Sequence, residues 1–467
     1  MRILFFIISF FIFSSNCTFA LDIVYPSAKE LTKNANSTFF IGNTNPNATL
    51  KINSESVKLW DEGVFVQIVP LYSGENIIKI ESTLQGKTET KIFKITRPKF
   101  QPAKSAPIPF IEKEAGTYLY TKTINNRSTV REKPSSSGKR IIDLPKGVIL
   151  YLSGIQGDYY KIEESGKTEF WIHKSNIQEP CIVTKRIPAT IKSIGEKSDK
   201  LYNYTKMTIS HPVMYTIEQE NKKLILTLYG TQKEEDNNQE SKNAEFIFED
   251  KNPVVGYDGE YKDDKFILRR ARVADKVNIY KPLHGVRIFV DAGHGGSEKG
   301  SVGPTRVCEK DVNLAITKNL VKLLQEEGAI VSFSRLEDKN INLYDRIKIA
   351  KDNNAYISLS IHSNALPDGK NPYTDHGTEV HYYNDNAKVL ANIIKNNLAN
   401  DLNLRDNGIR KSSFAMTRET NPISVLIEVA YMINPEEYKK LKDANFQEKA
   451  AESIKKSLEE FMILLKK

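Results

Sequence analysis

The sequence pattern changes at residue 285, and this change constrains the fold more than any other feature of the chain. From there to the C-terminus, short apolar runs typical of buried strands alternate with segments whose apolar residues recur every three or four positions. The expected strands are 286–290, 329–333, 355–361, 379–383 and 425–429, and the expected helices are 311–327, 343–351, 388–402 and 445–465. Because parallel strands are joined by crossovers that are usually helical, residues 285–467 are predicted to form an α/β domain with a largely parallel sheet covered by helices.

Residues 21–275 lack this alternation and contain short strand-like runs separated by turn clusters, which is typical of all-β folds. Four prolines between residues 98 and 109 predict an extended linker over residues 98–115. We therefore expect β-rich modules over residues 21–97, 116–180 and 181–275. The predicted fold class is multidomain, with N-terminal all-β modules followed by a C-terminal α/β domain.

The first 20 residues have the features of a secretory signal peptide. Arg2 supplies a positive charge, residues 3–13 are almost entirely apolar, and Thr18 and Ala20 place small residues before a cleavage point. No later segment is long and apolar enough to span a bilayer. We therefore expect a protein without a transmembrane segment that is secreted, periplasmic or associated with the cell wall.

The net charge limits the expected binding partners, and the cysteine content limits the type of fold. The net charge of +9 favours an anionic partner such as nucleic acid, anionic lipid or a wall polymer, and its other interpretation is that the excess lysine only keeps the protein soluble. Nucleic-acid binding is not expected, because no basic run is interleaved with aromatic residues. Outside the signal peptide the chain has only Cys181 and Cys308, so it is no disulfide-built scaffold, and the sequence does not decide whether the two pair.

Four ionisable residues occur where the α/β domain is expected to place its site. Open α/β sheets bind ligands beyond the carboxyl ends of their strands. His294 follows the first expected strand, His362 follows the third, Glu428 lies near the end of the last, and Glu309 opens the first long helix. We expect these four side chains to converge.

Two histidines and one glutamate form a recognised catalytic zinc set, which leaves the fourth coordination position for water. One Zn²⁺ ion bound by His294, Glu309 and His362 would lower the pKa of its bound water toward about 7, so hydroxide would be available as a nucleophile at neutral pH. Glu428 is the candidate for the carboxylate that transfers the proton to the leaving nitrogen.

Each of these residues also has an ordinary structural interpretation. A histidine after a strand is often a loop or core residue, Glu309 could be a helix-start charge favoured by the helix dipole, and Glu428 could be a buried acid with a partner. His376 and His381 are competing ligands. Glu379 and His381 share one face of a strand and could form an alternative pair.

Several stretches together carry a family resemblance. They are residues 290–296 (Val-Asp-Ala-Gly-His-Gly-Gly), 309–314 (Glu-Lys-Asp-Val-Asn-Leu), 360–365 (Ser-Ile-His-Ser-Asn-Ala), 377–379 (Gly-Thr-Glu) and 426–428 (Leu-Ile-Glu). With these motifs in this order, residues 286–467 resemble the zinc-dependent N-acetylmuramoyl-L-alanine amidases of bacterial cell walls.

The resemblance implies a secreted zinc hydrolase that cleaves the amide bond between N-acetylmuramic acid and L-alanine of peptidoglycan, in wall remodelling or daughter-cell separation. It implies one zinc ion, held by His294, Glu309 and His362, with Glu428 as the catalytic carboxylate, and it argues against His376 and His381 as ligands. Two alternatives are a zinc peptidase that cuts within the stem peptide and a non-catalytic wall-binding protein. Substrate-binding residues are not identified.

The sequence departs from the family pattern at two places. Ala292 stands where the family often has proline, and residues 429–434 replace a more common Gly-aromatic pair after the catalytic acid. Some family members also carry a long insertion between the third and fourth strands that plugs the zinc site. Here residues 366–376 are too short for a plugging helix, so an open groove is expected.

The β-rich modules carry weaker resemblances. Residues 21–97 are similar to immunoglobulin-like modules of bacterial surface proteins, and residues 116–180 to bacterial SH3-like domains. Residues 181–275 are similar to the β domains that precede the catalytic domain in some wall amidases. These resemblances imply binding to peptidoglycan or to other wall polymers.

Overall fold

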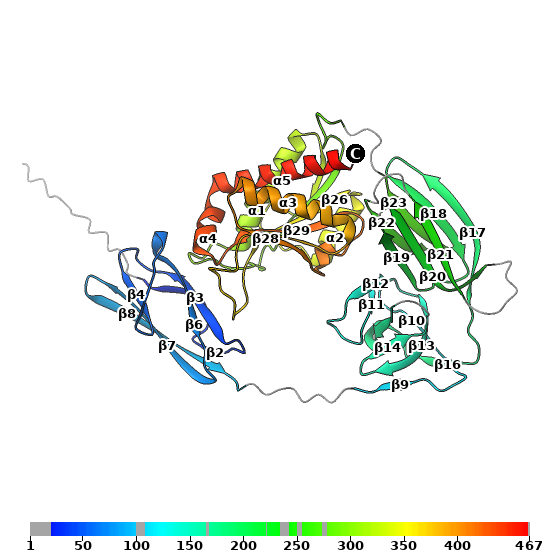
Figure 1. The fold of residues 1–467 in the computed structure, drawn as a ribbon, viewed down its shortest axis with the longest axis horizontal. Coiled ribbons are helices and arrows are strands. Elements are labelled where there is room, and N and C mark those ends of the chain that lie inside the picture. Colours follow the sequence, from blue (N-terminus) through cyan, green and yellow to red (C-terminus); the bar gives the residue numbers. More distant parts are fainter. Residues whose placement is uncertain are drawn as a thin grey trace, which may run out of the picture.

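A computed structural model of the chain describes residues 20–99, 108–164, 168–220, 222–233, 242–249, 255–272 and 278–465. Residues 1–19 of the expected signal peptide and residues 100–107 of the expected linker lie outside the described residues. In Figure 1 the α/β part, drawn from light green to red, has the blue N-terminal strands on one side and the cyan and green strands on the other.

Residues 22–97 form two packed sheets. One has the order β1-β3-β6 and the other β2-β8-β7-β4-β5. Apolar side chains that alternate along the strands, such as Phe40, Phe65, Ile80 and Ile95, fill the space between the two sheets. The strands are β1 (Asp22–Tyr25), β2 (Glu30–Thr32), β3 (Ser37–Asn43), β4 (Thr49–Ile52), β5 (Glu55–Val57), β6 (Val64–Pro70), β7 (Gly74–Leu84) and β8 (Lys87–Arg97), with a 3-10 turn η1 at Asp61–Gly63.

Two further sheets follow. The first is eight-stranded and contains β9 (Phe110–Glu112), β10 (Tyr118–Lys122), β11 (Ser128–Arg131), β12 (Arg140–Leu144), β13 (Ile149–Gln156), β14 (Tyr159–Ile162), β15 (Trp171–His173) and β16 (Cys181–Val183). The second is seven-stranded and contains β17 (Ala189–Ser198), β18 (Tyr202–Ile209), β19 (Tyr215–Glu220), β20 (Lys223–Lys233), β21 (Lys242–Glu249), β22 (Tyr257–Lys262) and β23 (Lys265–Ala271). One continuous apolar core joins the two sheets.

The C-terminal sheet is six-stranded, in the order β25-β24-β26-β29-β27-β28. Its strands are β24 (Arg287–Ala292), β25 (Ile330–Phe333), β26 (Ile357–Asn364), β27 (Thr378–Tyr382), β28 (Asp406–Lys411) and β29 (Ile423–Tyr431). The first four in spatial order are parallel, whereas β27 is antiparallel to β29 and parallel to β28. The predicted fold class, all-β modules followed by an α/β domain with a largely parallel sheet, is confirmed.

Five helices belong to this domain: α1 (Glu309–Glu326), α2 (Leu343–Asp352), α3 (Lys388–Asp401), α4 (Pro435–Lys442) and α5 (Ala444–Leu464). The apolar stripes of α1, α3 and α5 pack on one face of the sheet, where Ile357, Leu359 and Ile361 of β26 point. On the other face, Ile347 of α2 packs against Phe289 of β24. Among the described residues, no helix has the length and apolar character needed to cross a membrane.

The N-terminal two-sheet unit contacts a loop of the α/β domain, residues 366–376, that lies between β26 and β27 and contains no helix. Asp368 of this loop accepts hydrogen bonds from Tyr25 (2.8 Å) and Thr38 (2.7 Å), and its Oδ2 lies 2.5 Å from Lys33 Nζ. Beside this polar cluster, Phe39, Ile41 and Val66 pack against Ile433, Ala365 and Leu366. We call these contacts the docking interface.

Candidate metal centre

His294 lies in the turn that follows β24. Its backbone adopts the left-handed conformation, with φ of 59°. Two buried arginines stabilise this turn: the Arg335 guanidinium donates to the carbonyl oxygens of Ala292, Gly293 and His294, and Arg346 donates to those of Ala292 and His294.

Arg346 also pairs with Asp291, the penultimate residue of β24, through Nη1 and Oδ1 at 2.6 Å. Burial alone would raise the pKa of Asp291, but Arg346 and the hydroxyl groups of Ser360 and Ser334 hold it below its ordinary value. Sequence reasoning missed Asp291, Arg335 and Arg346 as positioning residues. Asp291 lies inside the motif that contains His294, but nothing in the spacing of the two arginines links them to it.

Glu309 is the first residue of α1, as expected from the sequence. Its Oε2 accepts hydrogen bonds from the amide (2.8 Å) and the hydroxyl (3.1 Å) of Ser301, which orients the carboxylate. Its Oε1 faces both histidines, 3.2 Å from His294 Nε2 and 3.0 Å from His362 Nδ1. Burial would raise the pKa of Glu309, but the hydrogen bonds and charges of the two histidines lower it strongly, so it is a carboxylate.

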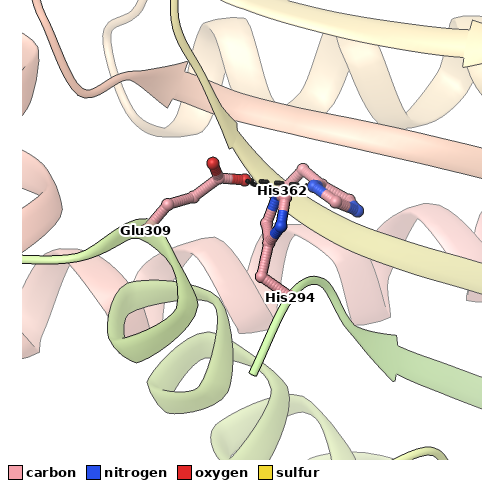
Figure 2. Close-up of side chains that lie close together, drawn as sticks. All are labelled: His294, Glu309 and His362. Atoms are coloured by element: carbon pink, nitrogen blue, oxygen red, sulfur yellow. Dashed lines mark hydrogen bonds and ion pairs between the residues drawn. The ribbon is translucent and has the colours of Figure 1, made fainter. Parts of the chain in front are cut away.

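His362 lies within β26, because this strand extends three residues beyond its expected end. Ligand atoms of His294, Glu309 and His362 lie within 4.8 Å of one another, and the described residues contain no other such group of three. Figure 2 shows the three side chains pointing toward a common point. Ligands about 2.1 Å from a tetrahedral zinc ion are separated by about 3.4 Å, so spacings of 3.0 and 3.2 Å fit a single metal ion.

Two positions near these ligands must be glycine, because a side chain there would collide with a ligand. A Cβ on Gly293 would lie 2.4 Å from Cε1 of His362. A Cβ on Gly300, whose φ is +68°, would lie 2.4 Å from Oε2 of Glu309. A larger residue at either position would therefore displace a ligand.

Glu428 of β29 lies beside the cluster, as the Cα partner of His362 on one side and of Glu379 on the other. Its Oε2 is buried and has no hydrogen-bond partner. Burial raises the pKa of Glu428 well above its ordinary value, and the nearby carboxylates of Glu309 and Glu379 add to this effect. A buried carboxyl oxygen without a hydrogen-bond partner is costly unless it serves a function.

The competing ligands lie elsewhere. His376 Nδ1 contacts Glu437 Oε1 at 2.7 Å, and His381 Nε2 contacts Glu379 Oε1 at 2.8 Å. Glu379 and His381 do form the expected pair, but the described residues supply no third ligand to it. Cys181 and Cys308 are both free thiols.

Two imidazoles and a carboxylate around one point, with a further carboxyl group beside them at the edge of an α/β sheet, form a site typical of metal-dependent hydrolases. Comparison with known proteins identifies the family. The family model described as N-acetylmuramoyl-L-alanine amidase matches residues 288–460. The chain belongs to this family through its C-terminal domain, which is a cell-wall hydrolase domain. Membership implies an extracytoplasmic location.

The chain is similar to several individual proteins. The uncharacterized protein YqiI of Bacillus subtilis (strain 168) is 33% identical over 185 residues, which are 39% of this chain and 87% of YqiI. N-acetylmuramoyl-L-alanine amidase LytC of the same organism is 36% identical over 177 residues, 37% of this chain and only 35% of LytC. Among solved structures, one match is the catalytic domain of CwlV, an N-acetylmuramoyl-L-alanine amidase from Bacillus (Paenibacillus) polymyxa var. colistinus. It is 32% identical, and the match covers 38% of this chain and 98% of the CwlV chain, with a TM-score of 0.36.

Proposed function

We propose that the chain hydrolyses the amide bond between N-acetylmuramic acid and L-alanine of peptidoglycan, with one zinc ion held by His294, Glu309 and His362. The observation that carries the proposal is the convergence of these three ligand atoms within 4.8 Å. Nitrogen and carboxylate donors suit zinc, and the side chains of His294 and His362 are 32% and 16% exposed, so a substrate can reach them.

Zinc held by these residues would supply a Lewis acid for the carbonyl group and would lower the pKa of water, so that hydroxide is available as the nucleophile near neutral pH. The protein residues supply positioning and proton transfer. Ser301 and Asn313 orient the Glu309 carboxylate, and Arg335 and Arg346 fix the turn that carries His294. Glu428 is proposed to take a proton from the attacking water and to deliver it to the L-alanine nitrogen, because a carboxyl group with a raised pKa can do both near neutral pH.

The substitution Glu428→Gln tests this role. We expect it to lower kcat by at least about a hundredfold, as loss of a general acid or base does, while zinc content stays at one ion per chain. Mass spectrometry of the products identifies the bond that is cut. A freed lactyl carboxylate on the sugar supports the amidase, whereas a new amino group within the stem would indicate a peptidase. Full activity of Glu428→Gln would rule out the assigned role.

We further propose that residues 1–20 direct export, that residues 98–115 are a linker, and that residues 21–97, 116–180 and 181–275 are wall-binding modules of immunoglobulin-like, SH3-like and β-rich type. The two-sheet arrangement of residues 22–97 and the antiparallel sheet of residues 110–183 support this. The inactive Glu428→Gln chain is expected to co-sediment with purified peptidoglycan sacculi, and a chain that stays in the supernatant would contradict wall binding.

A further inference from the structure

A row of polar side chains crosses the C-terminal sheet from the metal cluster toward β28. His362 of β26, Glu428 of β29 and Glu379 of β27 are successive cross-strand partners, so their side chains point to the same face of the sheet. The residues that alternate with them point into the core beneath α1, α3 and α5. The polar row therefore lies on the opposite face, in line with the metal cluster.

Arg410 ends this row. Its Nε lies 2.6 Å from Oε2 of Glu379, which is 4% exposed and also accepts a hydrogen bond from Asn407 (2.8 Å). The other oxygen of Glu379 contacts His381. The Glu379 carboxylate is thus fully occupied and fixes the position of the Arg410 guanidinium group.

The outer part of the guanidinium is available. Among the described residues, Glu379 is the one acid within ion-pair distance of the Arg410 side chain, which is 53% exposed, and Asp375 raises the pKa of Arg410 only from farther away. The two terminal nitrogens form a planar fork, which matches the two oxygens of a carboxylate. A fork that is held in place from behind loses little rotamer freedom when it binds such a group.

The distance from the cluster sets where this carboxylate would lie on the substrate. Glu379, which holds the Arg410 guanidinium, is two strands from His362, or about 10 Å at a strand spacing of about 4.8 Å, and β28 is one strand farther, at about 14 Å. An extended peptide spans about 3.3–3.6 Å per residue, so these separations correspond to about three to four residues.

We propose that Arg410 is a specificity residue that binds a free carboxylate of the stem peptide, two to four residues beyond the amide bond that is cut. The proposal rests on the proposed function, because it requires the stem to lie along the polar row. It assigns a substrate-binding residue, a role for which the sequence motifs name no candidate.

The test uses the full chain with zinc and two soluble muropeptides of equal length, one with free stem carboxylates and one with these groups amidated. For Arg410→Gln we expect KM for the free-acid substrate to rise about ten- to a hundredfold, the range given by hydrogen bonds to charged groups. The kcat on that substrate and both constants on the amidated substrate should change less than about threefold. Arg410→Lys retains the charge next to Glu379 without the fork, and should give an intermediate KM.

Lys411→Gln is the matched control, because Lys411 is the next residue of β28, is 46% exposed and pairs with Asp385 instead. If Arg410→Gln impaired cleavage of both substrates equally, or of neither, the proposed role of Arg410 would be wrong, while the proposed function of the chain would stand. A wild-type chain that cleaves neither muropeptide would overturn the proposed function, and the role of Arg410 with it.

Discussion

At the scale of single residues, Arg346 contributes both to the stability of the fold and to the geometry of the metal site. It is 5% exposed, pairs with Asp291 (1% exposed) and donates to two carbonyl oxygens of the turn that carries His294. Removing one partner of a buried ion pair leaves an uncompensated charge, which is far more costly than the net contribution of the pair.

We therefore expect Arg346→Ala to lower the free energy of unfolding by about 3–5 kcal/mol. It should also weaken zinc binding about 10- to 100-fold, because the turn that positions His294 loses two hydrogen bonds. Urea unfolding of the metal-free chain and a zinc titration measure the two effects. Arg287→Ala is the control: Arg287 lies on β24, the strand that carries Asp291, and its side chain makes one exposed hydrogen bond among the described residues, to the carbonyl of Asn353, so the substitution should cost less than about 0.5 kcal/mol.

The cost of Arg346→Ala should depend on pH. Arg346 holds the pKa of Asp291 below its ordinary value of 3.8, so the pair stabilises the fold above pH 3.8. As the pH falls below 3.8 and through the lowered pKa, Asp291 becomes protonated and this contribution is lost. The difference in unfolding free energy between wild type and Arg346→Ala should shrink there. A difference that stays constant from pH 6 to pH 3 would contradict the role of the ion pair.

The convergence of the three metal ligands could be predicted from the sequence, whereas the arginines that hold the His294 turn in place could not. His294, Glu309 and His362 follow or open elements with strong apolar patterns, so their common edge of the sheet is predictable. Arg335 and Arg346 act through backbone carbonyl groups that are distant in the sequence, and such contacts leave no periodic signal. The assignment of Glu428 as the catalytic acid stays a prediction.

At the scale of elements, the strands and helices of the C-terminal domain with a clear apolar pattern were predictable, whereas β28 and α4 were missed. Strands β24, β26 and β29 and helices α1, α3 and α5 lie close to their expected residues, because each presents a continuous apolar pattern to the core. Strand β28 was missed because Asp406–Lys411 contains a single apolar residue, Ile409, as suits an edge strand. The missed strand is the one that carries Arg410.

Helix α4, also missed, depends on its N-cap. Asn434 is 5% exposed, its side-chain oxygen accepts from the amides of Glu436 and Glu437, and its side-chain amide donates to the carbonyl of Pro372 in the loop 366–376. We expect Asn434→Ala to destabilise the chain by about 2 kcal/mol, because a cap and a buried hydrogen bond are lost together.

Asn342→Ala is the comparison, since Asn342 caps α2 through one bond, to the amide of Tyr344, and should cost about 1 kcal/mol. Chemical unfolding of both variants measures the difference. If Asn434→Ala cost no more than Asn342→Ala, the contact with Pro372 would contribute nothing.

At the scale of the whole molecule, the chain has separate apolar cores, so it should unfold in more than one step. The proposed zinc site lies in the C-terminal domain, so zinc should raise the midpoint of that transition alone. At zinc concentrations near 100 times Kd, the stabilisation is about 2.7 kcal/mol, or about 5–10 °C for a domain of this size. Calorimetry with and without a chelator checks this, and in His362→Ala the shift should disappear.

The docking interface could not be predicted from the sequence, because it joins residues more than 300 positions apart through a few side chains. Asp368 is its polar centre, with three donors from the N-terminal unit, and its side chain is only 15% exposed. The substitution Asp368→Lys would place a second ammonium group against Lys33. We expect this repulsion to open the interface and to increase the radius of gyration measured by small-angle X-ray scattering.

The exchanged pair Lys33→Asp with Asp368→Lys restores opposite charges and should return the radius of gyration toward the wild-type value. Asp61→Lys is the matched control at the same pair of units, because Asp61 contacts Lys439 across a site where both side chains are more than two-thirds exposed. Exposed ion pairs contribute little, so this variant should stay compact. If Asp368→Lys also stayed compact, the apolar contacts around Ile433 together with the remaining polar contacts, such as that of Asp22 with Arg306, would be sufficient for docking, and the polar cluster would have no part in holding the N-terminal unit against the loop 366–376.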